Sequence, residues 1–152
     1  MANRMRLHRY NRPLLDMPTS KLHGEDISQR SPKTLLIVDN DLLQVKELRE
    51  FVTAIGLECV DAFNGFEALA KIRQYPIGIV LMDIRIPGMD GIETLNHIKR
   101  KHPNLPVILM SSYHEKIIEA NQGKLDAFAI IEKPIPLRSL GRYLREKLNA
   151  NS

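Results

Sequence analysis

The sequence predicts an α/β fold in which a doubly wound, five-stranded parallel sheet is flanked by five helices. Short aliphatic runs of four to six residues alternate with amphipathic stretches, and turn residues separate the two. Runs of this kind are typical of strands buried on both faces of a parallel sheet. The chain has 152 residues, of which 43% are hydrophobic and 26% are charged. These values fit one globular domain.

The predicted elements follow one another from residue 33 onward. Strands are expected at 35–38, 57–60, 77–82, 107–110 and 128–131. Apolar residues recur with helical spacing at 42–55, 65–74, 91–101 and 137–148, and a weaker helical pattern covers 114–121. Five strand–helix units in this length predict a three-layer α/β domain.

The net charge of +4 is unevenly distributed. Residues 1–31 carry six basic and three acidic side chains, and we expect them to form a disordered or partly ordered basic leader before a domain at 32–150. An Arg-rich, acid-free start leaves an organellar transit peptide as an alternative. Because the excess charge lies outside the folded part, direct nucleic-acid binding is not expected. No apolar run predicts a membrane span, and the single Cys59 fits a reducing, cytoplasmic location.

Polar residues follow four of the five predicted strands. Residues 39–41 (Asp-Asn-Asp) follow the first strand, Asp83 the third, Ser111 the fourth and Lys133 the fifth. The carboxyl ends of parallel strands meet at one edge of a sheet, so these side chains should lie together. Clustered carboxylates favour Mg²⁺, and a metal with a lysine can neutralise a transferring phosphoryl group. The pattern therefore predicts a phosphoryl-acceptor site with Asp83 as nucleophile.

These segments resemble the receiver domain of two-component response regulators, of the kind found in chemotaxis regulators. The matching segments are 36–39, 62–69, 80–91, 106–111 and 133–134, within a resemblance that covers about residues 33–150. The resemblance implies a flavodoxin-like sheet of strand order 2-1-3-4-5. It also implies a cis peptide bond between Lys133 and Pro134.

By this resemblance, Asp83 would accept a phosphoryl group from a sensor histidine kinase or a phosphotransfer protein, and Ser111 and Lys133 would contact the phosphoryl oxygens. The Mg²⁺ ligands would be Asp39, Asn40, Asp83 and the backbone carbonyl of Arg85. Such a domain promotes its own phosphorylation and dephosphorylation and is not a turnover enzyme. It would signal through the face of its fourth helix, fifth strand and fifth helix, to a protein target or a missing output domain. The same face could form a homodimer.

Two positions depart from the family pattern. Asn40 replaces the usual second acid, so we expect weaker Mg²⁺ binding, and Asp41 is either a compensating ligand or the N-cap of the next helix. Ile130 stands three residues before Lys133, where the family has an aromatic switch residue. Phe128 should point to the same face as Ile130, either as a core residue or in place of the missing aromatic.

Other residues have both a structural and a functional interpretation. Arg85 and Tyr113 either flank the site and tune the phosphate lifetime or are ordinary rim residues. Residues 99–102 (Lys-Arg-Lys-His) are interpreted as a solvated helix end. A basic stripe on the last helix is either solvated or a surface for an acidic partner; it consists of Arg138, Arg142 and Arg145.

Three other functions compete with a phosphoacceptor. Asn40 and Ile130 motivate a receiver-like interaction module that is not phosphorylated. An Asp-x-Asp at 39–41 also resembles the nucleophile motif of haloacid-dehalogenase-type phosphatases, but the later acids at 83 and 90 do not fit that family. A flavin or nucleotide carrier would need a Gly- or Ser/Thr-rich phosphate loop after the first strand, where this chain is acidic.

Overall fold

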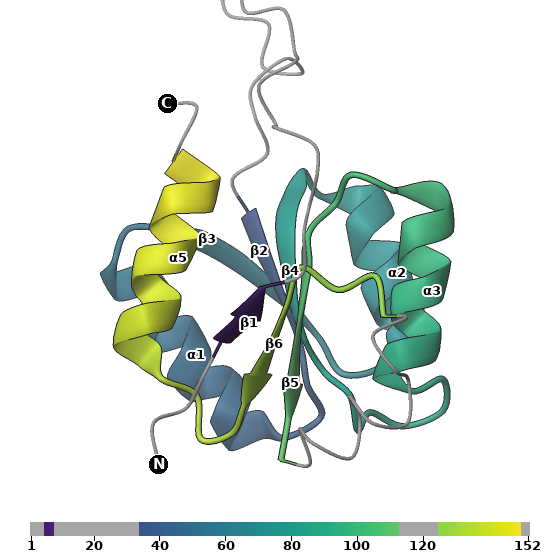
Figure 1. Cartoon of the computed structure of the whole chain (residues 1–152), viewed down its shortest axis with the longest axis horizontal. Helices are drawn as coiled ribbons and strands as arrows, with labels where there is room; N and C mark the ends of the chain where they lie inside the picture. Colours follow the sequence, from purple (N-terminus) through teal and green to yellow (C-terminus); the bar gives the residue numbers. More distant parts are fainter. Residues whose placement is uncertain (1–4, 8–33, 113–124, 150–152) are drawn as a thin grey trace, which may run out of the picture.

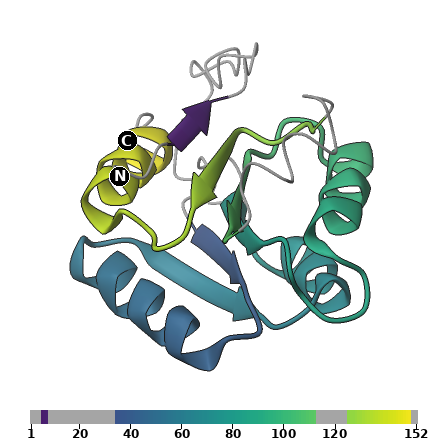
Figure 2. The same ribbon diagram turned by 60° about the horizontal axis from the view of Figure 1, so that its bottom comes forward.

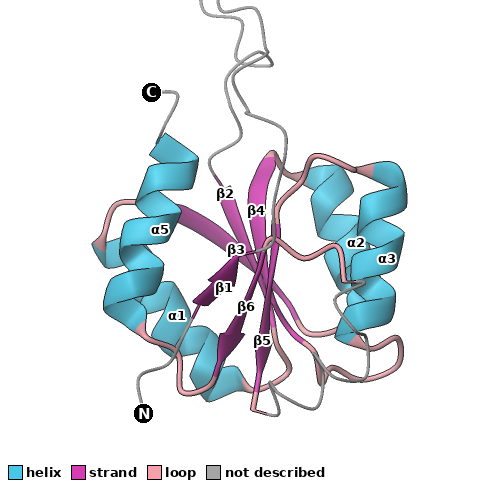
Figure 3. Ribbon diagram, in the orientation of Figure 1, coloured by secondary structure: helices cyan, strands magenta, loops and turns pink. Residues whose placement is uncertain are grey.

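The computed structural model describes residues 5–7, 34–112 and 125–149, which form one sheet with helices on both faces (Figure 1, Figure 3). The strands are β1 (Met5–Leu7), β2 (Thr34–Val38), β3 (Glu58–Ala62), β4 (Ile77–Asp83), β5 (Val107–Ser111) and β6 (Ala129–Glu132). The helices in these residues are α1 (Leu42–Ala54), α2 (Gly65–Gln74), α3 (Gly91–Lys101) and α5 (Leu137–Asn149). None of these helices is long and apolar enough to cross a membrane.

The strand order is β1-β6-β5-β4-β2-β3, and every neighbouring pair except β1–β6 is parallel. The five parallel strands therefore have the order 2-1-3-4-5 when they are numbered along the chain, which confirms the predicted fold. The helix predicted at 114–121 lies outside the described residues. Strand β1, which pairs antiparallel with β6, was not predicted by the sequence.

Apolar side chains of the central strands alternate between two cores, one on each face of the sheet. On β2, Leu35 and Ile37 face the core beneath α1 and α5, whereas Leu36 and Val38 face the core beneath α2 and α3. Figure 2 shows these two helix pairs on opposite sides of the sheet. All four side chains are fully buried, as expected for a strand covered on both faces.

Three helices begin just after strands at the same edge of the sheet, and a polar residue caps each of them. The Asp41 carboxylate accepts hydrogen bonds from the amides of Leu43 and Gln44, which supports its interpretation as an N-cap. Asn64 caps α2, and Asp90 caps α3. These caps fix the start of α1, α2 and α3 beside the ends of β2, β3 and β4.

Glycine allows close approach at two helix positions. A Cβ on Gly91 would lie 2.6 Å from the carbonyl oxygen of Asp83, so α3 can begin directly against the end of β4 only with glycine there. A Cβ on Gly141 would lie 2.6 Å from Cζ of Phe51, and α5 therefore packs against α1 through this small residue. The first contact holds the backbone of the candidate site in place.

The expectation for Phe128 was wrong in one respect. Ile130 packs in the core beneath α2 and α3, but Phe128 packs in the opposite core, with its ring centroid 5.1 Å from that of Tyr143. The chain bends at Phe128 and β6 begins only at Ala129, so strand alternation does not extend back to this residue. Phe128 is therefore a core residue and does not replace the aromatic that Ile130 lacks.

Lys99 also differs from expectation, because it is not part of a solvated helix end. It is 9% exposed, and its ammonium donates to the carbonyl oxygens of Pro103 and Leu105. Burial lowers the pKa of Lys99, against the attraction of Asp126. Its neighbours Arg100 and Lys101 are exposed, as predicted.

Candidate functional site

Polar side chains from three strand ends meet at one edge of the sheet. Asp39 follows β2, Asp83 ends β4, and Lys133 follows β6. The Nζ atom of Lys133 lies 2.5 Å from Oδ2 of Asp83 and 3.3 Å from Oδ2 of Asp39. The structure thus brings together the two acids and the lysine that the sequence placed at one edge.

Backbone amides fix the other oxygen of each carboxylate. The amide of Asp41 donates to Oδ1 of Asp39 at 2.9 Å, and the amide of Arg85 donates to Oδ1 of Asp83 at 2.8 Å. Each donor lies two residues after its acceptor, which is the spacing of an Asx-turn. Both carboxylates are therefore oriented with Oδ2 toward Lys133. Sequence reasoning missed these two amides, although the spacing was visible.

The two carboxylates are largely removed from water. Asp39 is fully buried and Asp83 is 8% exposed. Burial, together with the nearby charge of Asp83, raises the pKa of Asp39 above its usual value, although the Asp41 amide and Lys133 oppose the shift. Burial alone would lower the pKa of Lys133, but hydrogen bonds and attraction from Asp83 and Asp39 outweigh it and raise the pKa. The lysine is accordingly held in its charged form between two acids.

Ser111 completes the same edge from β5. It is 4% exposed, it is in register with Glu132 of β6, and its carbonyl oxygen accepts from the amide of Lys133 at 2.9 Å. The peptide bond between Lys133 and Pro134 is cis, which confirms the expectation from the sequence. Ser111 is thereby anchored next to the residue that carries the ammonium.

The remaining predicted site residues lie on the rim. Asn40 is exposed in the turn between Asp39 and Asp41, and the side chain of Arg85 is exposed in the loop after Asp83. Tyr113 lies outside the described residues.

The chemistry of the donor set fits Mg²⁺. Asp39 and Asp83 offer carboxylate oxygens, and the amide of Asn40 and the carbonyl of Arg85 are neutral oxygens close by in the chain. Hard oxygen ligands suit this ion, which also retains water molecules. No group of three or more His, Cys, Asp or Glu side chains that could hold a metal occurs within the described ranges. An ion at this site would therefore depend on two carboxylates supplemented by neutral ligands.

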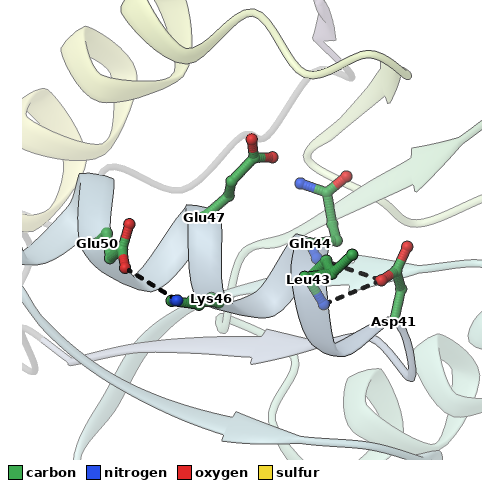
Figure 4. A pocket seen from close by; sticks show the side chains of 6 residues that line it. All are labelled: Asp41, Leu43, Gln44, Lys46, Glu47 and Glu50. Carbon is green, nitrogen blue, oxygen red and sulfur yellow. Dashed lines mark hydrogen bonds and ion pairs between the residues drawn. The ribbon is translucent and has the colours of Figure 1, made fainter.

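A separate hollow lies along the exposed side of α1, as Figure 4 shows. It is lined by Asp41, Leu43, Gln44, Lys46, Glu47 and Glu50. It contains neither Asp39, Asp83 nor Lys133. The candidate site at the carboxyl edge of the sheet therefore does not coincide with this hollow.

A doubly wound parallel sheet with two buried acids and a lysine at its carboxyl edge is the arrangement expected of a receiver domain. Residues 35–145 match the family model of the response regulator receiver domain. The chain therefore belongs to the response regulator receiver domain family.

Curated relatives are longer than this chain. The transcriptional regulatory protein ZraR of Klebsiella oxytoca is 35% identical over 114 residues, which are 75% of this chain and 26% of that protein. The DNA-binding transcriptional regulator NtrC of Salmonella typhimurium is 35% identical over 101 residues, which are 66% of this chain and 22% of that protein. The chain thus spans about a quarter of the length of these relatives.

Solved structures of single receiver domains match nearly their full length. A CheY-like receiver domain protein from Methanospirillum hungatei is 30% identical with a TM-score of 0.67, covering 79% of this chain and 96% of that one. The receiver domain of NtrX from Brucella abortus is 28% identical with a TM-score of 0.66, covering 77% of this chain and 99% of that one.

Proposed function

We propose that this receiver domain takes a phosphoryl group from a histidine kinase or a phosphotransfer protein onto Asp83, in a Mg²⁺-dependent reaction. The observation that carries the proposal is the position of Oδ2 of Asp83, which faces Lys133 beside the second buried carboxylate of Asp39. Membership of the receiver family supports the same function. We also propose residues 32–150 as the receiver unit, preceded by a leader at 1–31.

The chemistry follows from how the two oxygens of Asp83 are held. Oδ1 accepts the Arg85 amide, whereas Oδ2 faces Lys133 and is the oxygen that attacks phosphorus. A phosphorus–oxygen bond forms to Asp83 as the phosphorus–nitrogen bond to the donor histidine breaks, and the imidazole leaves with the electron pair of that bond. The ammonium of Lys133 then leaves the carboxylate and binds a phosphoryl oxygen, whose negative charge it neutralises. The hydroxyl of Ser111 donates to another.

When bound, Mg²⁺ would supply charge neutralisation for the transferring phosphoryl group. The residues that would hold it are Asp39, Asn40, Asp83 and the backbone carbonyl of Arg85. Asp39 serves this role because its carboxylate is already turned toward the site by the amide of Asp41. Asn40 contributes an oxygen without a charge, so we expect weaker binding than two adjacent acids would give.

The signalling output is proposed to pass through β6, α5 and the segment before β6, toward a protein target or an output domain. The curated relatives are described as transcriptional regulators, and this chain corresponds to about a quarter of each. We propose that the domain works in the cytoplasm and that it modulates its own phosphorylation without acting as a turnover enzyme. A homodimer through the same elements belongs to this proposal.

The alternative is a receiver-like interaction module that is never phosphorylated. Two observations favour it: Asn40 lacks the charge of an acid, and Ile130 is an aliphatic core residue, 1% exposed, where the family has a mobile aromatic. The retained contacts of Lys133 with both acids favour phosphorylation instead.

The test uses the full chain with acetyl phosphate, with and without Mg²⁺, read by intact mass. Asp90→Asn is the matched control, because Asp90 is an exposed cap on the same loop and asparagine also caps helices. We expect one added phosphoryl group in the wild type and in Asp90→Asn, only with Mg²⁺, and none in Asp83→Asn. If the wild type gains no mass and beryllofluoride with Mg²⁺ shifts no NMR signal, the interaction module is the correct interpretation.

A further inference from the structure

One strand of the sheet comes from a part of the chain that lies outside the family match. The match covers residues 35–145, whereas β1 lies near the start of the sequence. Three residues of β1 pair antiparallel with three residues of β6, in the register Met5 with Ile131, Arg6 with Ile130 and Leu7 with Ala129. Figures 1 and 2 both show β1 alongside β6, on the side of α5. This chain therefore adds a strand to the receiver sheet, beside the strand that leads into Lys133.

Strand β6 positions the lysine of the candidate site. It ends at Glu132, and the next residue is Lys133, whose amide donates to the carbonyl oxygen of Ser111 at 2.9 Å. The pairing with β1 reaches Ile131, two residues before the lysine. Strand β6 is thus paired with β5 on one side and with β1 on the other, close to the point from which the ammonium extends.

The ammonium lies where a phosphoryl group would have to enter. Nζ of Lys133 is 2.5 Å from Oδ2 of Asp83, the oxygen to which phosphorus would bond, and 3.3 Å from Oδ2 of Asp39. Phosphorylation therefore requires the ammonium to withdraw. The lysine side chain is only 18% exposed, so it has little space for a new rotamer. With β6 held on both sides the side chain must make the whole adjustment, whereas with a free edge the end of β6 can share it.

The pairing of β1 is short and loosely tethered. Strand β1 has three residues, fewer than the usual strand length, and residues 8–33 separate it from β2. A three-residue pairing contributes few hydrogen bonds, while closing a long connection costs chain entropy. The free energy that keeps β1 on β6 is therefore small, and β1 can leave without unfolding the parallel sheet.

We propose that β1 is a regulatory strap, which opposes phosphorylation of Asp83 while it is paired with β6. The paired strap holds the arrangement in which Lys133 binds both acids. Its release lets the end of β6 shift as the ammonium moves to the phosphoryl group. Because coupling between two equilibria is reciprocal, a phosphoryl group on Asp83 in turn weakens the pairing of β1. This inference rests on the proposed phosphorylation of Asp83.

The experiment measures the affinity of the full chain for beryllofluoride, a mimic of the phosphoryl group, by NMR titration in the presence of Mg²⁺. The variant is Arg6→Pro/Leu7→Pro. Successive amides of a strand point to opposite sides, so one of the two prolines removes a donor toward β6 in either orientation. Ser28→Pro/Gln29→Pro, in the connection to β2, is the matched control. Circular dichroism verifies the fold of each protein.

We expect the Arg6→Pro/Leu7→Pro variant to bind beryllofluoride at least about fivefold more tightly than the wild type and the control, which is the lower end of common coupling between sites. A synthetic peptide of residues 1–12 should return the affinity of the variant toward that of the wild type. In the wild type, saturating beryllofluoride should speed amide exchange in β1. Asp83→Asn should show no such change.

An equal or lower affinity of the variant would overturn the strap and leave the phosphoryl-acceptor function intact. Unchanged exchange in β1 of the wild type, once beryllofluoride is bound, would overturn it as well. Because that measurement uses only the wild type, it decides the matter even where the variant fails to fold. A wild type that binds no beryllofluoride would contradict the phosphoryl-acceptor function, and the strap with it.

Discussion

The ammonium of Lys133 lies 2.5 Å from the carboxylate of Asp83, although 50 positions separate the two residues in the sequence. The same ammonium lies 3.3 Å from Asp39. One cation therefore lies within ion-pair distance of two buried acids.

Replacing Lys133 tests how much its ion pairs with Asp83 and Asp39 contribute to the free energy of unfolding. Lys133→Met leaves two buried carboxylates without a counter-ion, and breaking a buried pair in this way costs on the order of 3 kcal/mol of unfolding free energy. The same change removes a positive charge that competes with Mg²⁺. We expect the variant to unfold at a lower denaturant concentration than the wild type when Mg²⁺ is absent. Mg²⁺ should restore part of the lost unfolding free energy. It should also bind more tightly to the variant than to the wild type.

Lys46→Met is the control for that experiment, because Lys46 is an exposed lysine whose side chain is 73% accessible, 4.0 Å from Glu50. Its stability should stay within about 0.5 kcal/mol of the wild type. Equal stability of Lys133→Met and the wild type in the absence of Mg²⁺ would show that the lysine does not hold the acids together.

Asn40→Asp should strengthen Mg²⁺ binding. A unit negative charge about 4 Å from a divalent ion contributes about 2 kcal/mol even in water, which corresponds to about a 30-fold gain in affinity. The measurement is a Mg²⁺ titration followed by NMR. Asn96→Asp adds the same charge on the exposed face of α3 and should leave the affinity unchanged. No gain in Asn40→Asp would remove residue 40 from the metal site.

Tyr143→Phe should stabilise the protein. The hydroxyl of Tyr143 is buried and has no hydrogen-bond partner among the described residues, and burial strongly raises its pKa. An unsatisfied buried hydroxyl costs about 1–3 kcal/mol, which phenylalanine avoids while keeping the ring against Phe128. Chemical unfolding should show a higher midpoint, whereas a lower midpoint would reveal a polar partner for the hydroxyl.

Lys99→Met should destabilise the protein by about 1–3 kcal/mol, since the carbonyls of Pro103 and Leu105 lose their buried donor. Lys101→Met, two residues later and exposed, should have almost no effect. The comparison is made by urea unfolding. Equal effects of the two substitutions would mean that the buried ammonium of Lys99 makes no net contribution to the free energy of unfolding.

Much of the fold was readable from the sequence because the central strands are buried on both faces, so their apolar runs are continuous. The site residues were readable because parallel strands end at one edge. The amides that fix Asp39 and Asp83 were not predicted, since backbone donors carry no residue signature. The only feature of the sequence that indicates these hydrogen bonds is that each amide lies two residues after its acid.

The errors came from a local bend and from contacts that the sequence pattern does not show. Phe128 was assigned to the face of Ile130 by strand alternation, but a bend places it outside β6. Lys99 was interpreted as one of several solvated cations. In the structure, the segment between α3 and β5 supplies two carbonyl oxygens that accept from its ammonium. Strand β1 has only three residues, so its pattern was too short to predict a strand, and it depends on the edge of β6 for its pairing.

The central claim is that Asp83 itself carries the phosphoryl group, and chemical trapping tests it most directly. The chain is phosphorylated with acetyl phosphate and Mg²⁺ and then reduced with borohydride, which converts an aspartyl phosphate to homoserine, and the modified residue is located by peptide mass spectrometry. The account predicts homoserine at position 83 and none at 39 or 41. Homoserine at another acid, or no conversion in a protein that has gained a phosphoryl group, would contradict it.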